Sequence, residues 1–247
     1  AMELLDARAP LSKKFVRKVI VTRLHTMPQV ARLLGKDRAA KASVARHRIR
    51  VEGVLQRVEQ DALHLPFVIK TPDGHCSDVW LVHAIDCAIS NIVGWHLKIG
   101  AANESDGLRC VESAVFSKEA AFNRLRLDDC HDLYGLPALL VLDNGPEARG
   151  ERFRRLPQLG IDVDYCKARN PQKKPYIERI NRSLKEALEV LPGCTRMDGR
   201  DGQRDPVALG DTLMDLDELE RWIVRWYFDK WADTVLDRFV DEVAFED

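Results

Sequence analysis

The sequence has no long apolar run, and this absence argues against a membrane-spanning helix. A helix that crosses a bilayer needs about 18 to 20 consecutive apolar residues, and no run in this chain approaches that length. The first residues also lack the order of a signal peptide, in which a basic stretch precedes an apolar one and a small-residue cleavage site. We therefore expect a cytoplasmic protein with no membrane contact.

Cysteine is scarce and scattered, which argues against a zinc finger or a redox motif. The chain has six cysteines and no Cys-x-x-Cys pair. His75-Cys76 and Cys130-His131 are separated by the wrong spacing for a finger. No Ser, Cys or His arrangement suggests nucleophilic catalysis, so any chemistry must rest on other groups.

What the sequence does have is charge, distributed unevenly between its ends. The net charge is only -1. Residues 1–60 nevertheless hold 14 Lys/Arg against 5 Asp/Glu, whereas residues 201–247 hold 5 against 14. A basic segment at residues 1–50 suits contact with nucleic-acid phosphates. A solvated helix that pairs with the acidic end explains the same pattern, and charge alone leaves both interpretations open.

The apolar pattern predicts an α/β core, with 45% apolar residues to fill it. The expected strands lie at 57–69, 79–88, 91–100, 138–143 and 161–168, and the expected helices at 110–127, 151–160 and 176–191. The first three strands should form an antiparallel meander. The last two alternate with helices, so right-handed crossovers should place them parallel to the first strand. This order predicts a mixed five-stranded sheet flanked by helices.

Segments outside this core predict two extensions. Residues 11–47 have helical spacing and form most of a basic arm at 1–50. Residues 194–212 are polar and rich in Gly and Asp, which is typical of a mobile connector. Residues 216–243 read as an acidic amphipathic helical region. The domain boundaries we expect are therefore 1–50, 51–193 and 194–247.

Three acidic residues stand where a structural role is hard to supply. Asp61 interrupts the first strand, Asp143 ends the fourth strand just before Asn144, and Glu178 begins the last core helix. In a sheet with parallel crossovers, ligands collect at the carboxyl ends of the strands. If the fourth strand pairs with the first, the helix can lay Glu178 over the other two acids. Three carboxylates at close range repel, and bound divalent cations would offset that repulsion.

The helix that begins near Glu178 carries cations on the same face. Positions 178, 182 and 185 share one face of a helix, with Asn181 beside them. Arg182 and Lys185 could hold the phosphates of a DNA end, and Lys173 and Lys174 extend the positive path. Together with Asn181, these four residues are the DNA contacts that we expect. Ordinary pairing of Glu with Arg along a helix, worth about 0.3–0.5 kcal/mol, explains the spacing equally well when taken alone.

These segments together resemble the catalytic core of the retroviral integrase and DDE transposase superfamily. The resemblance is closest to bacterial transposases of the phage Mu type and covers roughly residues 50–193. It rests on "VEQDALHLP", "VWLVHAIDCAISNIVGWHL", "YGLPALLVLDNGPE" and "LGIDVDYCKARNPQKKPYIERINRSLKEALEVLPG", in that order and spacing. Between Asp143 and Glu178 lie 34 residues, close to the usual gap in the family.

The resemblance implies an RNase H-like fold and a polynucleotidyl transferase that cleaves DNA strands and transfers them. Asp61, Asp143 and Glu178 would bind two Mg²⁺ or Mn²⁺ ions, one activating water or a DNA 3′-hydroxyl and the other stabilising the leaving oxygen. Arg182 and Lys185 match residues that contact the donor DNA end in related integrases. Two alternatives remain: a nuclease of the same fold that does not join strands, and a catalytically silent module for DNA binding or assembly.

The resemblance also implies partners. They are DNA, both as transposon ends and as target, further copies of the chain when it assembles on DNA, and an ATPase. It implies a bacterial, nucleoid-associated location. The chain departs from the family at Ala148, where relatives usually have Phe, and in "KKPY", where proline stiffens a loop that is usually flexible.

Asp86 is the rival to Asp61 as the first acid. It lies in "HAIDCAIS" on the second strand, and antiparallel pairing could bring it near Asp61. The family pattern places the first acid on the first strand, so we favour Asp61 and expect Asp86 to support the site without binding metal. His64, three residues past Asp61, and Asn144 are further candidates for such support, although a strand histidine is more often structural.

Overall fold

A computed structural model of the chain describes residues 49, 51–128, 130–166, 174–197 and 200–234. The chain divides into two compact units, residues 1–50 and 51–247, and the second unit holds the elements described below. The predicted basic arm, Lys173 and the region after residue 234 lie outside the described residues.

The main sheet has five strands in the order β5-β4-β1-β6-β7. Their bounds are β1 Val58–His64, β4 Val79–Asp86, β5 Ile92–Ile99, β6 Leu139–Leu142 and β7 Asp162–Tyr165. β1, β4 and β5 pair antiparallel, whereas β6 pairs parallel with both β1 and β7. The prediction of a mixed five-stranded sheet is therefore confirmed. The first and fourth of the predicted strands lie side by side.

Alternation along the strands divides the side chains between two cores. On β4, Leu81 and Ile85 enter one core, whereas Val82 and Ala84 enter the other. All four are fully buried, as expected for a central strand covered on both faces. The same alternation on β1 places Asp61 on the face of Leu63.

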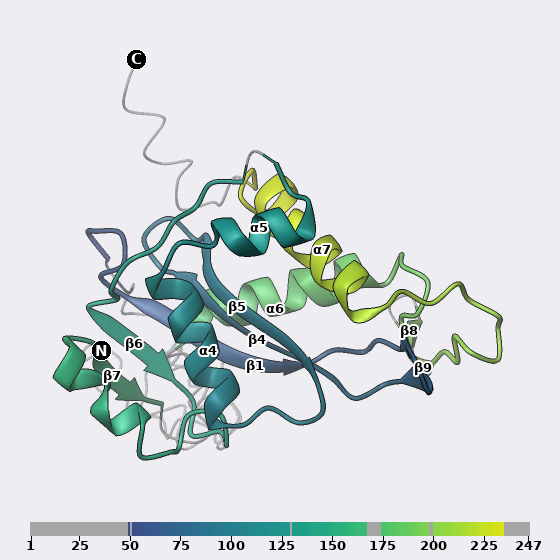
Figure 1. The fold of residues 1–247 in the computed structure, drawn as a ribbon, viewed down its shortest axis with the longest axis horizontal. Helices are drawn as coiled ribbons and strands as arrows, with labels where there is room; N and C mark the ends of the chain where they lie inside the picture. Colours follow the sequence, from purple (N-terminus) through teal and green to yellow (C-terminus); the bar gives the residue numbers. More distant parts are fainter. Residues whose placement is uncertain (1–48, 50, 129, 167–173, 198–199, 235–247) are drawn as a thin grey trace, which may run out of the picture. The chain divides into compact units, whose positions relative to one another are not determined.

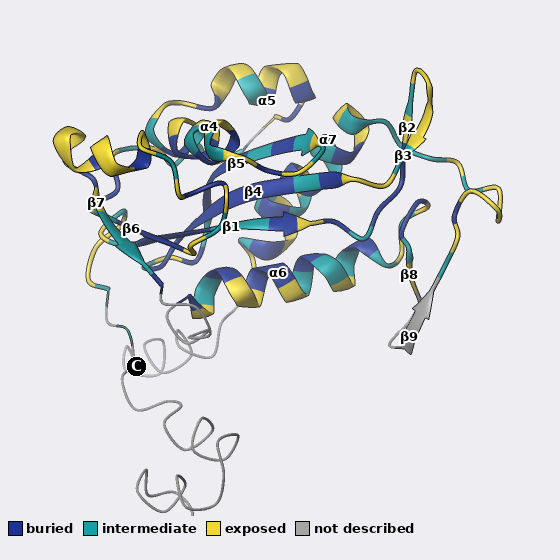
Figure 2. Cartoon of the chain, turned by 90° about the horizontal axis from the view of Figure 1, so that it is seen from below, coloured by how far each residue is buried: buried dark blue, intermediate teal, exposed yellow. Residues whose placement is uncertain are grey.

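Helices cover both faces of the sheet (Figure 1). Their bounds are α4 Glu104–Val115, α5 Glu119–Leu125, the 3₁₀ helix η1 Phe153–Leu159, α6 Pro175–Leu188, α7 Leu216–Trp226 and the π-helical turn η3 Tyr227–Trp231. α4 and η1 pack on the face of Val82, and α5, α6, α7 and η3 pack on the face of Leu81. Figure 2 shows the buried strands between α4 and α6. Among the described residues, no helix combines the length and apolarity needed to cross a bilayer.

The structure differs from the sequence-based elements in several places. The first predicted strand ends at His64, and a small hairpin of β2 Ile69–Thr71 and β3 Gly74–Cys76 follows it. The predicted helix 110–127 is two helices, α4 and α5, because Phe116 is extended. The predicted helix 151–160 is 3₁₀, with Pro157 inside it, and proline cannot donate the α-helical hydrogen bond.

The predicted connector is more structured than its composition suggests. It contains the antiparallel pair β8 Arg196–Met197 and β9 Arg200–Gln203. Asp211 accepts hydrogen bonds from the Arg204 side chain and from the Gly193 N–H. These bonds join the end of the segment to its start. The loop after Asp143 is also packed: Ala148 is buried in one core together with the fully buried ring of Phe153.

Candidate active site

Asp61 and Asp143 meet at one buried ammonium group. Lys174 Nζ lies 2.9 Å from Asp61 Oδ1 and 2.9 Å from Asp143 Oδ2. It also donates to the Gln60 carbonyl at 3.1 Å. The pairing of β1 with β6 explains the convergence, because Glu59 is opposite Val141 and two more positions along bring Asp61 beside Asp143.

The Lys174 ammonium is therefore buried in contact with Asp61 and Asp143. Its side chain is 3% exposed, against 22% for Asp61 and 52% for Asp143. Burial alone would lower the pKa of a lysine. Here the charges and hydrogen bonds of the two carboxylates outweigh burial, and the pKa of Lys174 is raised. From the sequence we predicted that Lys174 contacts DNA phosphates. In the structure its ammonium instead contacts Asp61 and Asp143.

Two more carboxylates belong to the same electrostatic cluster. Glu178, in the first turn of α6, has a raised pKa because of desolvation, with further contributions from Asp61 and Asp143 that partly oppose the effect of Lys174. The pKa of Glu147 is raised for the same reasons. Sequence reasoning missed Glu147, although it lies four residues after Asp143. Its carboxylate lies against Gly145, where a Cβ would collide with it.

Glu59 fixes the start of the helix that carries Glu178. This side chain is fully buried, and its Oε2 accepts the N–H groups of Tyr176 and Ile177 at 3.0 and 3.1 Å. Its Oε1 lies 3.3 Å from Arg57 Nη2. Lys174 supplies no side-chain cap to α6, so a carboxylate from β1 satisfies amide groups that the helix itself leaves unpaired. The start of α6 is thereby tied to the strand of Asp61.

Asn181 also connects α6 to Asp61. Its Nδ2 donates to Asp61 Oδ2 at 2.8 Å, and its Oδ1 lies 2.6 Å from His83 Nε2. The other ring nitrogen, Nδ1, lies 2.6 Å from the Tyr227 hydroxyl. Burial lowers the pKa of His83 to about 4. Asn181, predicted to face DNA, is thus buried against Asp61, and sequence reasoning missed His83 and Tyr227.

The donor set at this site suits a hard divalent cation. Asp61, Asp143, Glu147 and Glu178 offer carboxylate oxygens, which are the ligands that Mg²⁺ and Mn²⁺ prefer. Two of these carboxylates already converge on a cation, the Lys174 ammonium. In the described ranges, however, no group of three or more His, Cys, Asp or Glu side chains is arranged to hold a metal ion. The chemistry of the residues fits such an ion, and the position of Lys174 would have to change.

Asp86 is not the strand partner of Asp61, and its carboxylate has a structural role. In the antiparallel register, Asp86 pairs with Val58, and the partner of Asp61 is His83. The Asp86 carboxylate is fully buried. It accepts hydrogen bonds from the N–H groups of Leu55, Ala88 and Ile89 at 2.6–2.9 Å. These contacts close the turn after β4.

His64 and Asn144 also have structural contacts. His64 lies three positions after Asp61, so its side chain leaves the opposite face of β1. It lies 3.6 Å from Asp78 and its ring centroid is 5.1 Å from that of Trp80. Asn144 donates from Nδ2 to the Cys166 carbonyl at 3.1 Å, which links the ends of β6 and β7.

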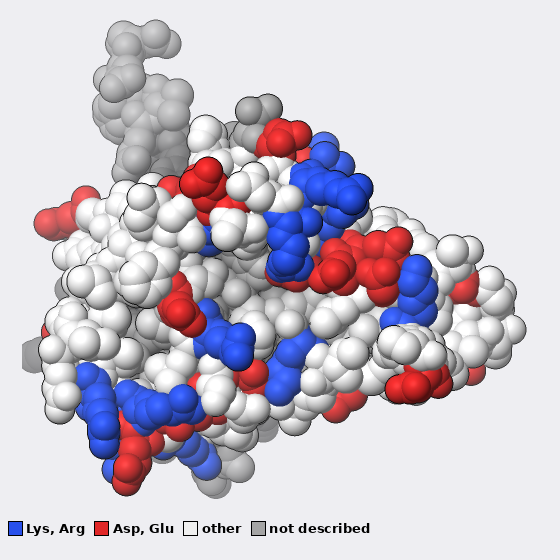
Figure 3. Space-filling model, in the orientation of Figure 1, with Lys and Arg blue, Asp and Glu red and all other residues white. Residues whose placement is uncertain are grey.

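The remaining predicted DNA contacts lie along α6. Arg182 is exposed and Lys185 is partly exposed. On the face that carries α4, Lys and Arg are interspersed with Asp and Glu, with no broad surface of one sign (Figure 3). α6 lies on the other side of the sheet, so that view does not bear on the predicted contacts.

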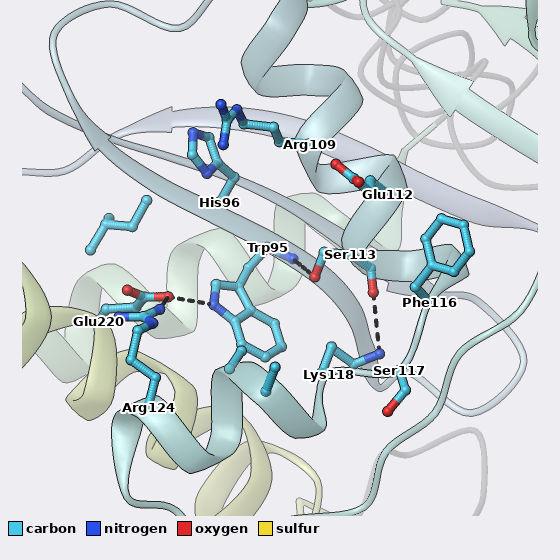
Figure 4. Close-up of a pocket in the computed structure, with 13 residues that line it drawn as sticks. Trp95, His96, Arg109, Glu112, Ser113, Phe116, Ser117, Lys118, Arg124 and Glu220 are labelled. Atoms are coloured by element: carbon cyan, nitrogen blue, oxygen red, sulfur yellow. Dashed lines mark hydrogen bonds and ion pairs between the residues drawn. The ribbon is translucent and has the colours of Figure 1, made fainter.

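A cavity of about 600 Å³ lies apart from the acids, between β5, α4, α5 and α7. None of the predicted site residues lines it. Figure 4 shows Trp95 Nε1 donating to Glu220 and Lys118 Nζ donating to the Ser113 carbonyl. Glu220 also pairs with Arg124 at 2.8 Å. The contacts of Glu220 join α7 to β5 and α5, and the contact of Lys118 joins the start of α5 to α4.

Comparison with known proteins gives one family. Residues 61–193 match the TnsB C-terminal domain, and this is more than half of the chain. No curated protein matches. The chain is similar to a chain in a cryo-EM structure of the simian T-cell lymphotropic virus intasome in complex with PP2A regulatory subunit B56 gamma. The identity is 19% and the TM-score 0.38, and the match covers 57% of this chain and 42% of that one.

Proposed function

Because the chain belongs to the TnsB C-terminal domain family, which relates it to transposases and integrases, we propose that it contains the catalytic core of a Mu-type DNA transposase. The core would be RNase H-like, cleaving DNA strands and joining a 3′ end to target DNA. The observation that carries this proposal is the convergence of Asp61 and Asp143 on one cation, in the same electrostatic cluster as Glu178. Sheet order supports it, because β6 brings Asp143 beside β1.

In this proposal Asp61, Asp143 and Glu178 would hold two Mg²⁺ or Mn²⁺ ions. When bound, these ions would supply charge neutralisation at the phosphate and activation of the attacking oxygen. Residues of the chain position the three acids. Glu59 holds the start of α6, and α6 in turn places Glu178 near the two strand acids. Because phosphoryl transfer depends mainly on positioning and electrostatics, no Ser, Cys or His nucleophile is required.

DNA is the substrate in this account. Arg182 lies one turn beyond Glu178 on α6 and is exposed, so it can reach a phosphate next to the acids, and Lys185 extends that face by a second turn. Assembly of several copies on DNA, an ATPase partner and a nucleoid location remain predictions of the resemblance.

One observation favours a second candidate, a catalytically silent module for DNA binding or assembly. The Lys174 ammonium already offsets part of the charge of Asp61 and Asp143, which reduces the repulsion between the acids without metal. In a silent module this ion pair would simply fix α6 against β1. The two candidates differ in whether a divalent cation can take the place of the ammonium.

A strand-transfer assay tests the proposal. The full chain is incubated with Mg²⁺, a short DNA duplex that ends in a free 3′-hydroxyl, and supercoiled plasmid as target. We expect joined products with the parent. Asp61→Asn should reduce joining by more than about 100-fold, beyond the usual cost of losing an outer partner of a metal ligand.

Asp86→Asn is the matched control, because it changes the rival acid in the same way. We expect it to retain joining, provided that circular dichroism shows a folded protein. Loss of joining in Asp86→Asn with full activity in Asp61→Asn would overturn the assignment of the acids. Cleavage of plasmid without joining would indicate a nuclease, and inactivity of the parent would favour the silent module.

A further inference from the structure

A chain of three hydrogen bonds runs from the C-terminal part of the described structure to Asp61. The Tyr227 hydroxyl lies 2.6 Å from His83 Nδ1, His83 Nε2 lies 2.6 Å from Asn181 Oδ1, and Asn181 Nδ2 lies 2.8 Å from Asp61 Oδ2. The three links join η3, the central strand β4, α6 and β1. Tyr227 and His83 are almost fully buried, so water does not compete for these contacts.

The chemistry of the groups assigns the donor and the acceptor in each of these three hydrogen bonds. An ionised carboxylate only accepts, so the Asn181 amide nitrogen must face Asp61 and its carbonyl oxygen must face His83. A carbonyl oxygen also only accepts, and therefore His83 carries its proton on Nε2. In a neutral ring Nδ1 is then an acceptor, and the Tyr227 hydroxyl must donate to it. The neutral ring agrees with the low pKa that burial gives His83.

Asp61 has two oxygens with different partners. Oδ1 faces Lys174, which bridges to Asp143, whereas Oδ2 faces Asn181. A change of cation at Oδ1 therefore leaves the contact at Oδ2 in place. Carboxylates that bind metals are usually held in this way by a hydrogen bond to the other oxygen, which fixes their orientation.

We propose that Tyr227, His83 and Asn181 are positioning residues that hold the Asp61 carboxylate in the orientation it needs to bind a cation. The orientation of Asp61 then depends on the seating of η3 against the sheet. Trp231 Nε1 supports that seating by donating to the Ser90 carbonyl at 2.7 Å. This inference rests on the proposed function for the role of Asp61, but the residues that it adds lie in β4 and η3.

A double-mutant cycle on the full chain tests the inference, with Mn²⁺ affinity measured by titration calorimetry. Tyr227→Phe removes one hydroxyl oxygen and should weaken Mn²⁺ binding by about 10-fold, the lower end of the usual effect of such partners. Asn181→Ala should weaken it by about 10- to 100-fold. If the residues act in series, Tyr227→Phe has no further effect in the Asn181→Ala background.

Tyr165→Phe is the matched control, because it removes a tyrosine hydroxyl on β7 that takes no part in the chain of hydrogen bonds. It should bind Mn²⁺ as the parent does. A merely structural role for Tyr227 would instead give losses that multiply in the double variant. That result, or parent-like affinity in Tyr227→Phe, would overturn the inference.

A nitrogen-15 spectrum of the histidine rings provides a readout that needs no metal. We expect His83 to be protonated at Nε2 only, and Tyr227→Phe to shift the Nδ1 resonance. A proton on Nδ1 would overturn the inference even if the variants fold poorly. A parent that binds no Mn²⁺ would contradict the proposed function, and the positioning role of Tyr227, His83 and Asn181 with it. A parent that binds Mn²⁺, but no tighter than Tyr227→Phe does, would overturn the positioning role alone.

Discussion

The Lys174 ammonium is in contact with two carboxylates, and its removal separates its structural role from any role of metal. Lys174→Met keeps the length of the side chain and removes the charge. Without metal, Asp61 and Asp143 then lose their common partner, and we expect the free energy of unfolding to fall by about 1–3 kcal/mol. In this variant no ammonium competes with Mn²⁺ for the two carboxylates. Mn²⁺ should therefore raise the melting temperature of Lys174→Met more than that of the parent.

Lys185→Met is the control for this prediction, because it removes a lysine from α6, two turns beyond Glu178. Its melting temperature should respond to Mn²⁺ as the parent does. An equal or smaller response in Lys174→Met would show that Lys174 does not occupy the place of a cation. Thermal unfolding with and without Mn²⁺ measures both variants.

The buried His83 ring predicts a pH dependence of stability. Its pKa is lowered from 6.5 to about 4, so between these values the unfolded chain takes up a proton that the folded chain does not. The corresponding stabilisation is present above pH 6.5 and is lost as the pH falls toward 4, by at most about 3 kcal/mol. His83→Gln should therefore show a shallower loss of stability over this window.

Carboxylates with a raised pKa act in the opposite sense, because the folded chain binds their protons more tightly. Glu59, Glu147 and Glu178 belong to this group. The measurement is therefore the difference between parent and His83→Gln in urea unfolding at several pH values. An equal slope in His83→Gln would contradict the buried neutral ring.

These residues also show what sequence reasoning can reach. Asp143 and Glu178 are separable from other acids because each stands next to the end of an element. Asp61 does not interrupt its strand as expected but lies inside the continuous strand β1, and the order of the strands brings it beside Asp143. Lys174 was predicted as a DNA contact because a basic loop before a helix gives no sign of which amine folds inward. His83 could have been noticed as a histidine in the apolar run "VWLVHAI", but its partner Tyr227 lies 144 residues away.

Among the helices, α6 depends on a neighbouring strand for its first turn. Glu59→Gln keeps the shape of the side chain but removes the charge that faces the N–H groups of Tyr176 and Ile177. We expect the free energy of unfolding to fall by about 1–2 kcal/mol, with faster amide hydrogen exchange at Tyr176 and Ile177. Loosening of this turn should also weaken Mn²⁺ binding, because Glu178 lies in it.

Asp215→Asn is the control, since Asp215 caps the first turn of α7 through the Glu218 N–H at 2.8 Å. It should speed exchange in α7 and leave α6 unchanged. If Glu59→Gln leaves exchange at Tyr176 and Ile177 unaltered, the tie between β1 and α6 is not what holds the helix start.

Element boundaries were predicted less well than element order. The apolar spacing of residues 110–127 continues across the extended Phe116, so periodicity alone joined α4 to α5. The break between β1 and β2 was not expected, and the register differs from the one that would bring Asp86 near Asp61: the partner of Asp61 is His83. Composition was a poor guide to residues 194–212, because contacts such as Arg204 with Asp211 depend on the fold.

Within residues 51–247, distant segments meet above one face of the sheet. Asp61 lies in β1, Asp143 directly follows β6, Glu178 lies in α6 and Tyr227 begins η3, so each comes from a different part of the chain. The parallel direction of the two later strands could be predicted because helical crossovers join them to the sheet, whereas the place of the fourth strand beside the first came from the resemblance. The side-chain contacts that give the site its charge balance could not, because they depend on rotamers and burial.

In the proposed function, Asp61, Asp143 and Glu178 together bind divalent cations in exchange for Lys174. Anomalous scattering from crystals of the full chain soaked in Mn²⁺ measures this exchange. We expect anomalous peaks at the Asp61 carboxylate, with the Lys174 ammonium displaced from between the two strand acids. Crystals saturated with Mn²⁺ that show no peak there, and Lys174 still 2.9 Å from both carboxylates, would contradict it.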